Sequence, residues 1–372
     1  MRGDLPYQLA LTFLPNIGCI QAKILLHHFG DAQAIFNAKK SQLEKIEGIG
    51  PARADAIKKF ANFMPIEKEC FFMEKYGIQT LFLSDKDYPQ RLLNCYDPPT
   101  LLFFKGNRSL NHARTVGIIG TRNNTEYGKL VAEKLIRELV PLDVMIISGL
   151  AFGIDAIAHK SALKYKLPTV GVLAHGLDCI YPSQHSSLAK EMLQHGGILT
   201  EFRSGCKPDK HHFPIRNRIV AGMCDATIVI ETGVKGGSMI TAELANGYNR
   251  DVFAFPGKIT DNKSAGCNQL IKSNKAILLT DTQQLIDSLG WSIDNSKAHT
   301  KVKGNGLQKE LFVQLSESEK LIVTMLSENK SMHIDELNIR SGIHTSAVAA
   351  AILNLELLGI IHTLPGRMYT LI

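Results

Sequence analysis

Between residues 66 and 290, short runs of β-branched and other apolar residues alternate with stretches of helical periodicity. Eight of these runs predict strands: 79–83, 115–119, 144–148, 169–173, 197–200, 226–230, 251–254 and 276–279. Continuous apolar strands that alternate with helices are typical of a parallel, doubly wound sheet. We therefore expect an α/β fold with an extended Rossmann-like parallel sheet as its core.

A helical region precedes this core. Residues 8–60 are predicted to be entirely helical, and the stretch LEKIEGIGPARADAIKKF is typical of a helix-hairpin-helix. Its glycines, Gly48 and Gly50, allow a tight turn whose backbone N–H groups can face a DNA phosphate. Such helix pairs also serve as structural bundles or protein-contact modules, and both interpretations stay open.

A polar segment and a second small domain follow the core. Residues 291–310 have no apolar period and are predicted to be a linker. Helices at 318–326, 334–341 and 346–357, followed by a hairpin, predict a winged helix. Its expected recognition helix, TSAVAAAILNLELLG, contains no Lys or Arg, whereas DNA reading needs donors and charge. We interpret this helix as a packing or protein-contact element. The predicted domains are 1–64 (all-helical), 65–290 (core), 291–310 (linker) and 311–372 (winged helix).

Composition sets weaker limits. The formal net charge of +7 fits a nucleic-acid-binding protein and a mildly basic enzyme equally well. The seven cysteines include no Cys-x-x-Cys pair, which favours reduced thiols in a cytoplasm over a zinc ribbon. Asp4 and Pro6 interrupt any early apolar run, so we expect no signal peptide. No uncharged apolar run reaches about 18 residues, so no membrane span is expected either.

The loops after the strands carry the chemical signals, because ligands of such sheets bind at the carboxyl ends of the strands. The first central strand ends in Gly120-Thr121-Arg122, and neither Gly-x-Gly-x-x-Gly nor Gly-x-x-x-x-Gly-Lys-Ser/Thr is present. The glycine permits close backbone approach, and Arg122 can grip a phosphate with its planar fork. This loop is therefore predicted to hold phosphate.

The next loop lies in SGLAFGIDAIAHKSAL, residues 148–163. Gly149 and Gly153 flank a turn, and Asp155 can cap the helix that follows. His159 lies one turn after Asp155, so the two side chains could pair. A metal pair would need a third ligand, which the nearby sequence does not offer. Helix capping and packing are therefore the favoured interpretation.

The segment from residue 206 to residue 218 is rich in basic residues. Between residues 206 and 218 stand four basic residues against one acidic residue, and Phe213 lies among them. Basic residues interleaved with an aromatic ring suit a single nucleic-acid strand, since cations meet phosphates and the ring meets a base. The alternative is a solvated loop anchored by Phe213. Tyr181, in the preceding loop AHGLDCIYPSQH, could stack on a base or simply pack.

A third glycine-bearing helix start, Gly236-Gly237-Ser238, forms another potential anion nest. Three helix starts of this kind along one side of a sheet offer more phosphate-binding positions than one mononucleotide would use. Together with the added cations, they favour a polymer as the ligand.

These motifs together resemble the DNA-processing protein A (DprA, or Smf) family. The matching segments are GTR at 120–122, SGLAFGIDAIAHKSAL at 148–163, GLDCIYP at 176–182, FPIRNRIVAG at 213–222, GGSMITAELA at 236–245 and FPG at 255–257. The resemblance covers essentially the whole chain and implies a sterile-alpha-motif-like front, a Rossmann core and a winged-helix tail.

This resemblance implies a non-enzymatic protein without a cofactor that binds single-stranded DNA during natural transformation, shields it from nucleases and loads RecA onto it. It implies a homodimer formed through the Rossmann core. The DNA-binding residues that it suggests, together with those of the loops above, are Gly120, Thr121, Arg122, Gly149, Lys210, Phe213, Arg216, Asn217, Arg218, Gly236, Gly237 and Ser238. One departure is that Ser183–His185 replaces a stretch that is basic or contains Asn in many members, which puts a backbone contact there in doubt.

An enzymatic alternative rests on the third loop. Gly236-Gly237-Ser238 with Thr241 and Glu243 resembles the Gly-Gly-x-Gly-Thr-x-x-Glu loop of nucleotide phosphoribohydrolases, in which the glutamate assists N-glycosidic cleavage. Here Ser238-Met239 replaces Gly-Thr, so the second half of that motif is altered. An ATP-driven motor is not expected, because the chain lacks a Walker loop and an acidic strand end for magnesium.

Overall fold

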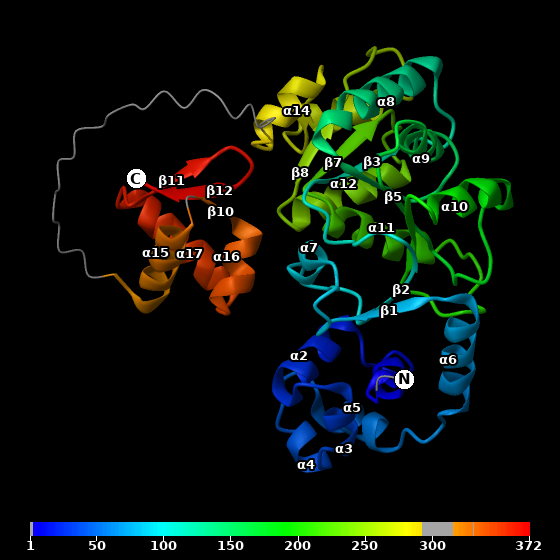
Figure 1. The fold of residues 1–372 in the computed structure, drawn as a ribbon, viewed down its shortest axis with the longest axis vertical. Helices are drawn as coiled ribbons and strands as arrows, with labels where there is room; N and C mark the ends of the chain where they lie inside the picture. Colours follow the sequence, from blue (N-terminus) through cyan, green and yellow to red (C-terminus); the bar gives the residue numbers. More distant parts are fainter. Residues whose placement is uncertain (1–2, 292–314, 330) are drawn as a thin grey trace. The chain divides into compact units, whose positions relative to one another are not determined.

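The computed structural model describes residues 3–291, 315–329 and 331–372, and the chain forms two compact units, residues 1–280 and 281–372 (Figure 1). The predicted linker at 291–310 lies outside the described residues except for Trp291. The unit boundary assigns helix α14 (Thr282–Ser288) to the second unit rather than to the core. The four predicted domain ranges stay a prediction.

The first unit begins with six helices: α1 (Leu5–Leu11), α2 (Cys19–Phe29), α3 (Ala32–Asn37), α4 (Lys40–Leu43), α5 (Gly50–Lys58) and α6 (Met64–Tyr76). Gly48 and Gly50 have φ angles of +82° and +60°, which is the left-handed region that glycine adopts most readily. They turn the chain sharply into α5, as the helix-hairpin-helix pattern predicts. Leu25, Ile35 and Ile57 are buried between these helices.

A nine-stranded sheet forms the core of the first unit. Its strands are β1 (Gln79–Phe82), β2 (Leu101–Gly106), β3 (Thr115–Gly120), β4 (Met145–Ser148), β5 (Thr169–Val172), β6 (Gly196–Thr200), β7 (Ala226–Ile230), β8 (Asp251–Ala254) and β9 (Ile277–Leu278). The strand order is β1-β2-β6-β5-β4-β3-β7-β8-β9. The order reverses between β3 and β7, which marks the switch point of a doubly wound sheet.

The sheet is parallel from β6 to β9 and antiparallel at its other edge. Strand β2, which we did not predict, pairs antiparallel with both β1 and β6. The α/β fold with an extended Rossmann-like parallel sheet is therefore confirmed, and β1 and β2 add an antiparallel edge to it. The connection from β1 to β2, residues 83–100, includes one four-residue helix but no long crossover helix of the kind that joins parallel strands, so β2 can run antiparallel to β1.

The helices between the parallel strands are α8 (Glu126–Glu138), α9 (Ile154–Lys164), α10 (Ser186–Met192), α11 (His212–Met223), α12 (Gly237–Gly247) and α13 (Ala265–Lys272). The short helix α7 (Gln90–Leu93) precedes them, and 3₁₀ turns lie at Val140–Leu142 and Ser183–His185. Helix α8 packs beside α9, and α11 beside α12. Right-handed crossovers on the two sides of the switch point place these two pairs on opposite faces of the sheet.

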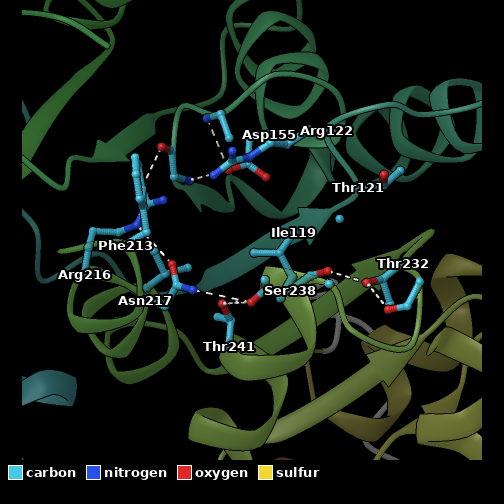
Figure 2. Close-up of a pocket in the computed structure, with 17 residues that line it drawn as sticks. Ile119, Thr121, Arg122, Asp155, Phe213, Arg216, Asn217, Thr232, Ser238 and Thr241 are labelled. Carbon is cyan, nitrogen blue, oxygen red and sulfur yellow. Dashed lines mark hydrogen bonds between the residues drawn. The ribbon is translucent and has the colours of Figure 1, made fainter. Parts of the chain in front are cut away.

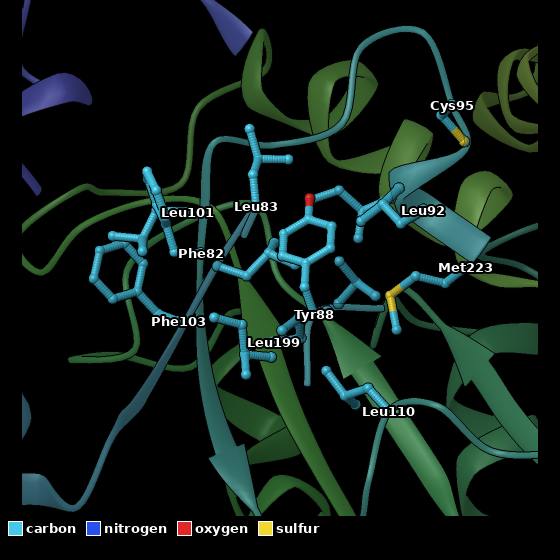
Figure 3. Close-up of a cluster of buried hydrophobic side chains, with 14 of the residues drawn as sticks. Phe82, Leu83, Tyr88, Leu92, Cys95, Leu101, Phe103, Leu110, Leu199 and Met223 are labelled. Carbon is cyan, nitrogen blue, oxygen red and sulfur yellow. The ribbon is translucent and has the colours of Figure 1, made fainter. Parts of the chain in front are cut away.

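A buried cluster joins the antiparallel edge to the rest of the core (Figure 3). Tyr88 is fully buried at its centre, and its hydroxyl donates a hydrogen bond of 2.7 Å to the carbonyl of Pro99. Leu92 from α7, Leu199 from β6 and Met223 from α11 surround it (Figure 3). The partner for the phenol matters, because a buried hydroxyl without one would destabilise the fold.

The second unit contains α14, α15 (Glu317–Glu328), β10 (Met332–His333), α16 (Ile334–Ser341), α17 (Thr345–Leu357), β11 (Ile361–Leu364) and β12 (Met368–Leu371). Its three-stranded sheet has the order β10-β12-β11. Ser316 and Glu319 form a capping box at the start of α15. The predicted winged helix is confirmed, with β10 as an additional strand. In the described part of the chain, no helix has the length and apolar character that a membrane span requires.

Candidate nucleic-acid interface

A cavity of about 320 Å³ opens at the carboxyl ends of β3, β4 and β7, at the switch point of the sheet (Figure 2). The residues predicted for the site that line it are Gly120, Thr121, Arg122, Gly149, Phe213, Arg216, Asn217, Gly236, Gly237 and Ser238. They come from three different loops and from the first turns of α11 and α12. The sheet thus brings together segments that are more than a hundred residues apart in sequence.

Glycines allow the loops after β3 and β4 to touch through their backbones. A Cβ on Gly120 would lie 2.0 Å from the carbonyl oxygen of Ile230, and one on Gly153 would lie 2.2 Å from that of Thr121. Gly153 also has a φ of +75°. Because no side chain fits at either position, the Gly-Thr-Arg turn lies directly against the end of β7 and the start of α9.

The start of α12 faces the cavity. Its N-cap, Gly236, has no side chain that could accept from the first N–H groups of this 11-residue helix. The nearby hydroxyl of Ser238 donates to the hydroxyl of Thr232 at 2.6 Å, and the helix start has no side-chain cap hydrogen bond. A helix start in this state presents N–H donors and the positive end of the helix dipole, which together favour an anion.

Arg122 and Phe213 form the open side of the cavity. The guanidinium carbon of Arg122 lies 5.4 Å from the centroid of the Phe213 ring, within the range of a cation–π contact. Arg122 is exposed, and its side chain forms no hydrogen bond or ion pair within the described ranges. Its charge is therefore free to meet a phosphate beside the aromatic ring.

Arg216 forms the floor of the cavity and has a different role. It is buried, and Nη1 donates to the carbonyls of Gly149, at 2.5 Å, and of Val172. A Cβ on Gly149 would lie 2.4 Å from this nitrogen, which explains the glycine. Burial lowers the pKa of Arg216 to about 10, and Asp155 opposes that shift. Arg216 therefore stays charged at neutral pH and ties the ends of β4 and β5 together.

Asp155 acts on the same loop. Its carboxylate accepts hydrogen bonds from the N–H groups of Gly149, at 3.1 Å, and Ala151, at 3.3 Å. Burial raises its pKa, and Arg216 opposes the rise. Asp155 does not cap α9, whose N-cap Gly153 has no side-chain hydrogen bond, and this part of the favoured interpretation is corrected. The alternative pairing with His159 is not formed either, because Nδ1 of that buried histidine bonds the hydroxyl of Thr169 at 2.7 Å. Asp155 therefore shapes the loop before α9.

Asn217 links the two helices at the cavity. Its side-chain amide donates to the carbonyl of Gly237 at 3.4 Å, and its oxygen accepts from Nε of Arg216 at 3.1 Å. These contacts connect the first turns of α11 to the start of α12 (Figure 2). Asn217 thus holds the position of the helix start that faces the ligand space.

Two residues predicted for the site, Lys210 and Arg218, do not line the cavity. Lys210 is exposed in the loop just before α11. Arg218 points elsewhere, and its guanidinium binds Glu201, the carbonyl of Asp97 and, at 3.4 Å, the sulfur of Cys19. These partners belong to the core and to the helical region, so the structure gives Arg218 a role in joining the two.

Sequence reasoning missed Glu231, which shapes the Gly-Thr-Arg turn from the end of β7. It is buried at a φ of +53°, an unusual backbone conformation for a glutamate. Its carbonyl accepts from the N–H of Thr121 at 2.7 Å, and its carboxylate accepts from the N–H and the hydroxyl of Thr125. An acidic residue directly after a buried strand was the signal that could have revealed it.

The phosphoribohydrolase-like motif is only partly in place. Thr241 lines the cavity, but Glu243 does not. Glu243 is exposed, and its carboxylate forms an ion pair of 3.1 Å with Lys275. The residue that would assist glycosidic cleavage is therefore absent from the ligand space. The described residues also contain no cluster of three or more His, Cys, Asp or Glu side chains suited to a metal.

The fold and the site together define a class of protein: a Rossmann-type core with an anion-binding cavity at its switch point, flanked by a helix-hairpin-helix region and a winged helix. Comparison with known families agrees. The model of the DNA recombination-mediator protein A family matches residues 79–290, a helix-hairpin-helix model matches 9–64, and the DprA winged helix domain matches 313–367. The chain belongs to the DNA recombination-mediator protein A (DprA/Smf) family.

Individual relatives support this assignment. Protein Smf of Synechocystis sp. is 31% identical over 400 residues, covering 99% of each chain. The X-ray structure of Streptococcus pneumoniae DprA superposes with a TM-score of 0.65 and 34% identity, over 75% of this chain and 95% of that one. DNA processing protein A of Helicobacter pylori, which is described as having a single-stranded DNA binding mode, has a TM-score of 0.52 and 33% identity over 57% of this chain and 96% of that one.

Proposed function

We propose that this protein binds single-stranded DNA at the cavity on the carboxyl edge of the sheet. In this proposal it acts in the cytoplasm as a homodimer formed through the Rossmann core, protects incoming DNA during natural transformation and loads a RecA recombinase onto it for recombination. Membership of the DprA/Smf family and the single-stranded DNA binding described for the Helicobacter pylori relative support it.

One observation carries the proposal. The unpaired guanidinium of Arg122 lies against the ring of Phe213, and both line the same cavity as the uncapped start of α12. A cation and free N–H groups bind phosphate, and an aromatic face beside them stacks on a base. A phosphate bound by the cation and a base stacked on the adjacent ring would belong to one nucleotide of a strand.

The surroundings of the cavity favour a strand over a free nucleotide. Lys207 and Lys210 are exposed in the loop that leads into α11, next to Phe213 in sequence. These cations are additional to those that one phosphate in the cavity would use. A polymer that passes the cavity would use them for its neighbouring phosphates, and salt would weaken that binding.

We infer that the site binds its ligand without catalysis. A glycosidic cleavage of the phosphoribohydrolase type needs a carboxylate at the bond, but Glu243 is paired with Lys275 outside the cavity. The carboxylate that does line the cavity, that of Asp155, accepts two backbone hydrogen bonds. Incubation with a nucleoside monophosphate should therefore release no free base, and release would restore the enzymatic alternative.

Fluorescence anisotropy with labelled single-stranded and duplex oligonucleotides tests the binding. We expect tighter binding of the single strand, with a logarithmic salt slope of about 0.7 per neutralised phosphate. The double variant Arg122→Ala, Lys210→Ala should lose affinity. The control pair Lys134→Ala, Lys164→Ala removes two exposed lysines that do not line the cavity, and it should bind like the unmodified protein. Equal affinity of both double variants would exclude this cavity as the DNA site.

A further inference from the structure

A second aromatic ring lies beside Phe213, outside the cavity. Tyr181 follows β5 in the loop before α10, and its ring centroid is 6.1 Å from that of Phe213, with the two planes inclined by 47°. The side chain is 49% exposed, so packing against Phe213 covers only part of it. Tyr181 does not line the cavity. It therefore offers an open aromatic surface next to the ring that faces the ligand space.

The loop that carries Tyr181 is tied to the loop that leads to Phe213. The N–H of Gly176 donates to the carbonyl of Cys206 at 2.9 Å, and the N–H of Gly205 donates to the carboxylate of Asp178 at 3.0 Å. A Cβ on Gly176 would lie 2.3 Å from the carbonyl oxygen of Arg203, so this close approach requires glycine. These contacts hold the loop that carries Tyr181 against the loop that leads to Phe213.

The loop is also fixed on its other side. The ring of His185 contacts the carbonyl of Leu150 at 2.9 Å, and the hydroxyl of Ser186 donates to the carbonyl of Ser183 at 2.6 Å. The first contact anchors the segment just after Tyr181 to the loop that follows β4, and the second stabilises the turn within that segment. A ring on an anchored loop loses little conformational entropy when a ligand stacks on it.

The spacing of the rings defines the ligand that they can accept. Neighbouring bases in a duplex strand lie only about 3.4 Å apart along the helix axis. The two ring centroids are 6.1 Å apart and their planes are not parallel. Two successive bases could each lie on one ring only after they have separated from each other. An unstacked single strand can do this, whereas a base-paired duplex cannot.

We propose that Tyr181 is a second base-stacking residue, which receives the base next to the one on Phe213. This inference rests on the proposed function and deepens it, because it assigns two adjacent nucleotides to the rim of the cavity. The strand then passes from the cavity toward the loop after β5. The pair of rings selects single-stranded over duplex DNA by the separation of the bases that it requires.

Binding of fluorescein-labelled (dT)₂₀ to Tyr181→Leu, Tyr181→Phe and a matched control tests the proposal. Loss of a stacked base weakens binding by about fivefold to a hundredfold, so Tyr181→Leu should bind at least about fivefold more weakly. Tyr181→Phe should bind like the unmodified protein. The control is Tyr96→Leu, which removes another exposed tyrosine, 62% exposed and packed on Tyr248, that belongs to neither loop and does not line the cavity.

An abasic oligonucleotide of the same length separates stacking from any other effect of the substitution. The unmodified protein and Tyr181→Leu should bind it equally, since it has phosphates but no bases. If Tyr181→Leu instead binds the abasic strand more weakly, the substitution acts through the loop structure, and the stacking role is excluded.

Photocrosslinking gives a direct readout. Oligothymidylates with 5-iododeoxyuridine at single positions should give adducts on Tyr181 and on Phe213, from adjacent nucleotides. Unchanged (dT)₂₀ affinity of Tyr181→Leu, together with no adduct on Tyr181, would overturn this inference while leaving the proposed function intact if Phe213→Ala still weakens binding. If the unmodified protein shows no preference for single strands, the proposed function itself fails.

Discussion

The cavity at the edge of the core sheet and helix α17 of the winged helix belong to two folds that often bind nucleic acid, yet they expose opposite chemistry. The cavity combines a free guanidinium on Arg122, an aromatic ring on Phe213 and an uncapped helix start. Helix α17 has no Lys or Arg, and its exposed side chains include Leu353 and Leu357. The presence of such a fold is therefore not enough to identify a DNA-binding surface. The side chains that the surface exposes must also suit a nucleic acid.

The two regions also differ in what lies beneath their surfaces. Under the cavity, Arg216 and Asp155 are buried charges that hold loops in place. Under α17 the core consists of aliphatic residues such as Ile322, Leu337 and Val348. Buried charges are costly unless their partners are in place, so the cavity region depends on specific contacts more than the winged helix does.

The largest expected effect concerns this buried support. Arg216→Met would leave Asp155 without its neighbouring charge and two carbonyls without a donor, so the free energy of unfolding should fall by about 3–5 kcal/mol. Urea denaturation followed by circular dichroism measures it. The control Arg122→Met removes an exposed arginine of the same cavity and should change stability by about 0.5 kcal/mol or less. A similar decrease in the free energy of unfolding for both variants would contradict the structural role that we assign to Arg216 and not to Arg122.

The next effect concerns the ring. Phe213→Ala should weaken binding to single-stranded DNA by about tenfold to a hundredfold, because a stacked base contributes about 1–3 kcal/mol. Fluorescence anisotropy measures the dissociation constant, and an unchanged circular dichroism spectrum shows that the variant is folded. An affinity within twofold of that of the unmodified protein would contradict the prediction that a base stacks on Phe213.

A third prediction concerns pH. Burial lowers the pKa of His159 to about 3, whereas an unfolded histidine has a pKa of about 6.5. As the pH falls below 6.5, the unfolded state takes up a proton that the folded state does not, so stability decreases by up to about 1.4 kcal/mol per pH unit. Between pH 6.5 and 5 the loss should be about 1.6 kcal/mol.

Urea denaturation at several pH values, with His159→Gln as the comparison, isolates this contribution. The variant keeps a polar group that can reach Thr169 but cannot titrate, so its stability should depend less on pH over the same interval. Parallel pH profiles for the two proteins would contradict the assignment of a neutral, buried histidine.

The smallest expected effect lies on α17. Leu357→Ser changes a side chain that is 77% exposed, so stability should change by about 0.5 kcal/mol or less. Affinity for single-stranded DNA should not change, because this helix has no Lys or Arg that could meet a phosphate. A clear loss of DNA affinity would show that the winged helix takes part in binding, and the contrast with the cavity would then be invalid.

Much of the fold could be predicted because its signals are local. Apolar strands alternating with helical periodicity indicated eight strands of the core, and the glycines around Gly48 indicated the tight turn before α5. The strand β2 and its antiparallel pairing were not predicted. The direction in which a strand enters a sheet depends on partners that are distant in sequence, here β1 and β6.

By itself, the sequence determined the class of fold, the order of the loops at the carboxyl edge and the residues that can bind an anion there, since glycine turns and helix starts are properties of short segments. Only the tertiary structure decided how Arg122, Arg216 and Arg218 differ. Arg122 is exposed at the cavity, Arg216 is buried beneath it, and Arg218 is held by Glu201. Three identical side chains acquire three roles because burial and the nearest carboxylate or carbonyl, which are set by packing, determine whether a guanidinium is free to meet a ligand.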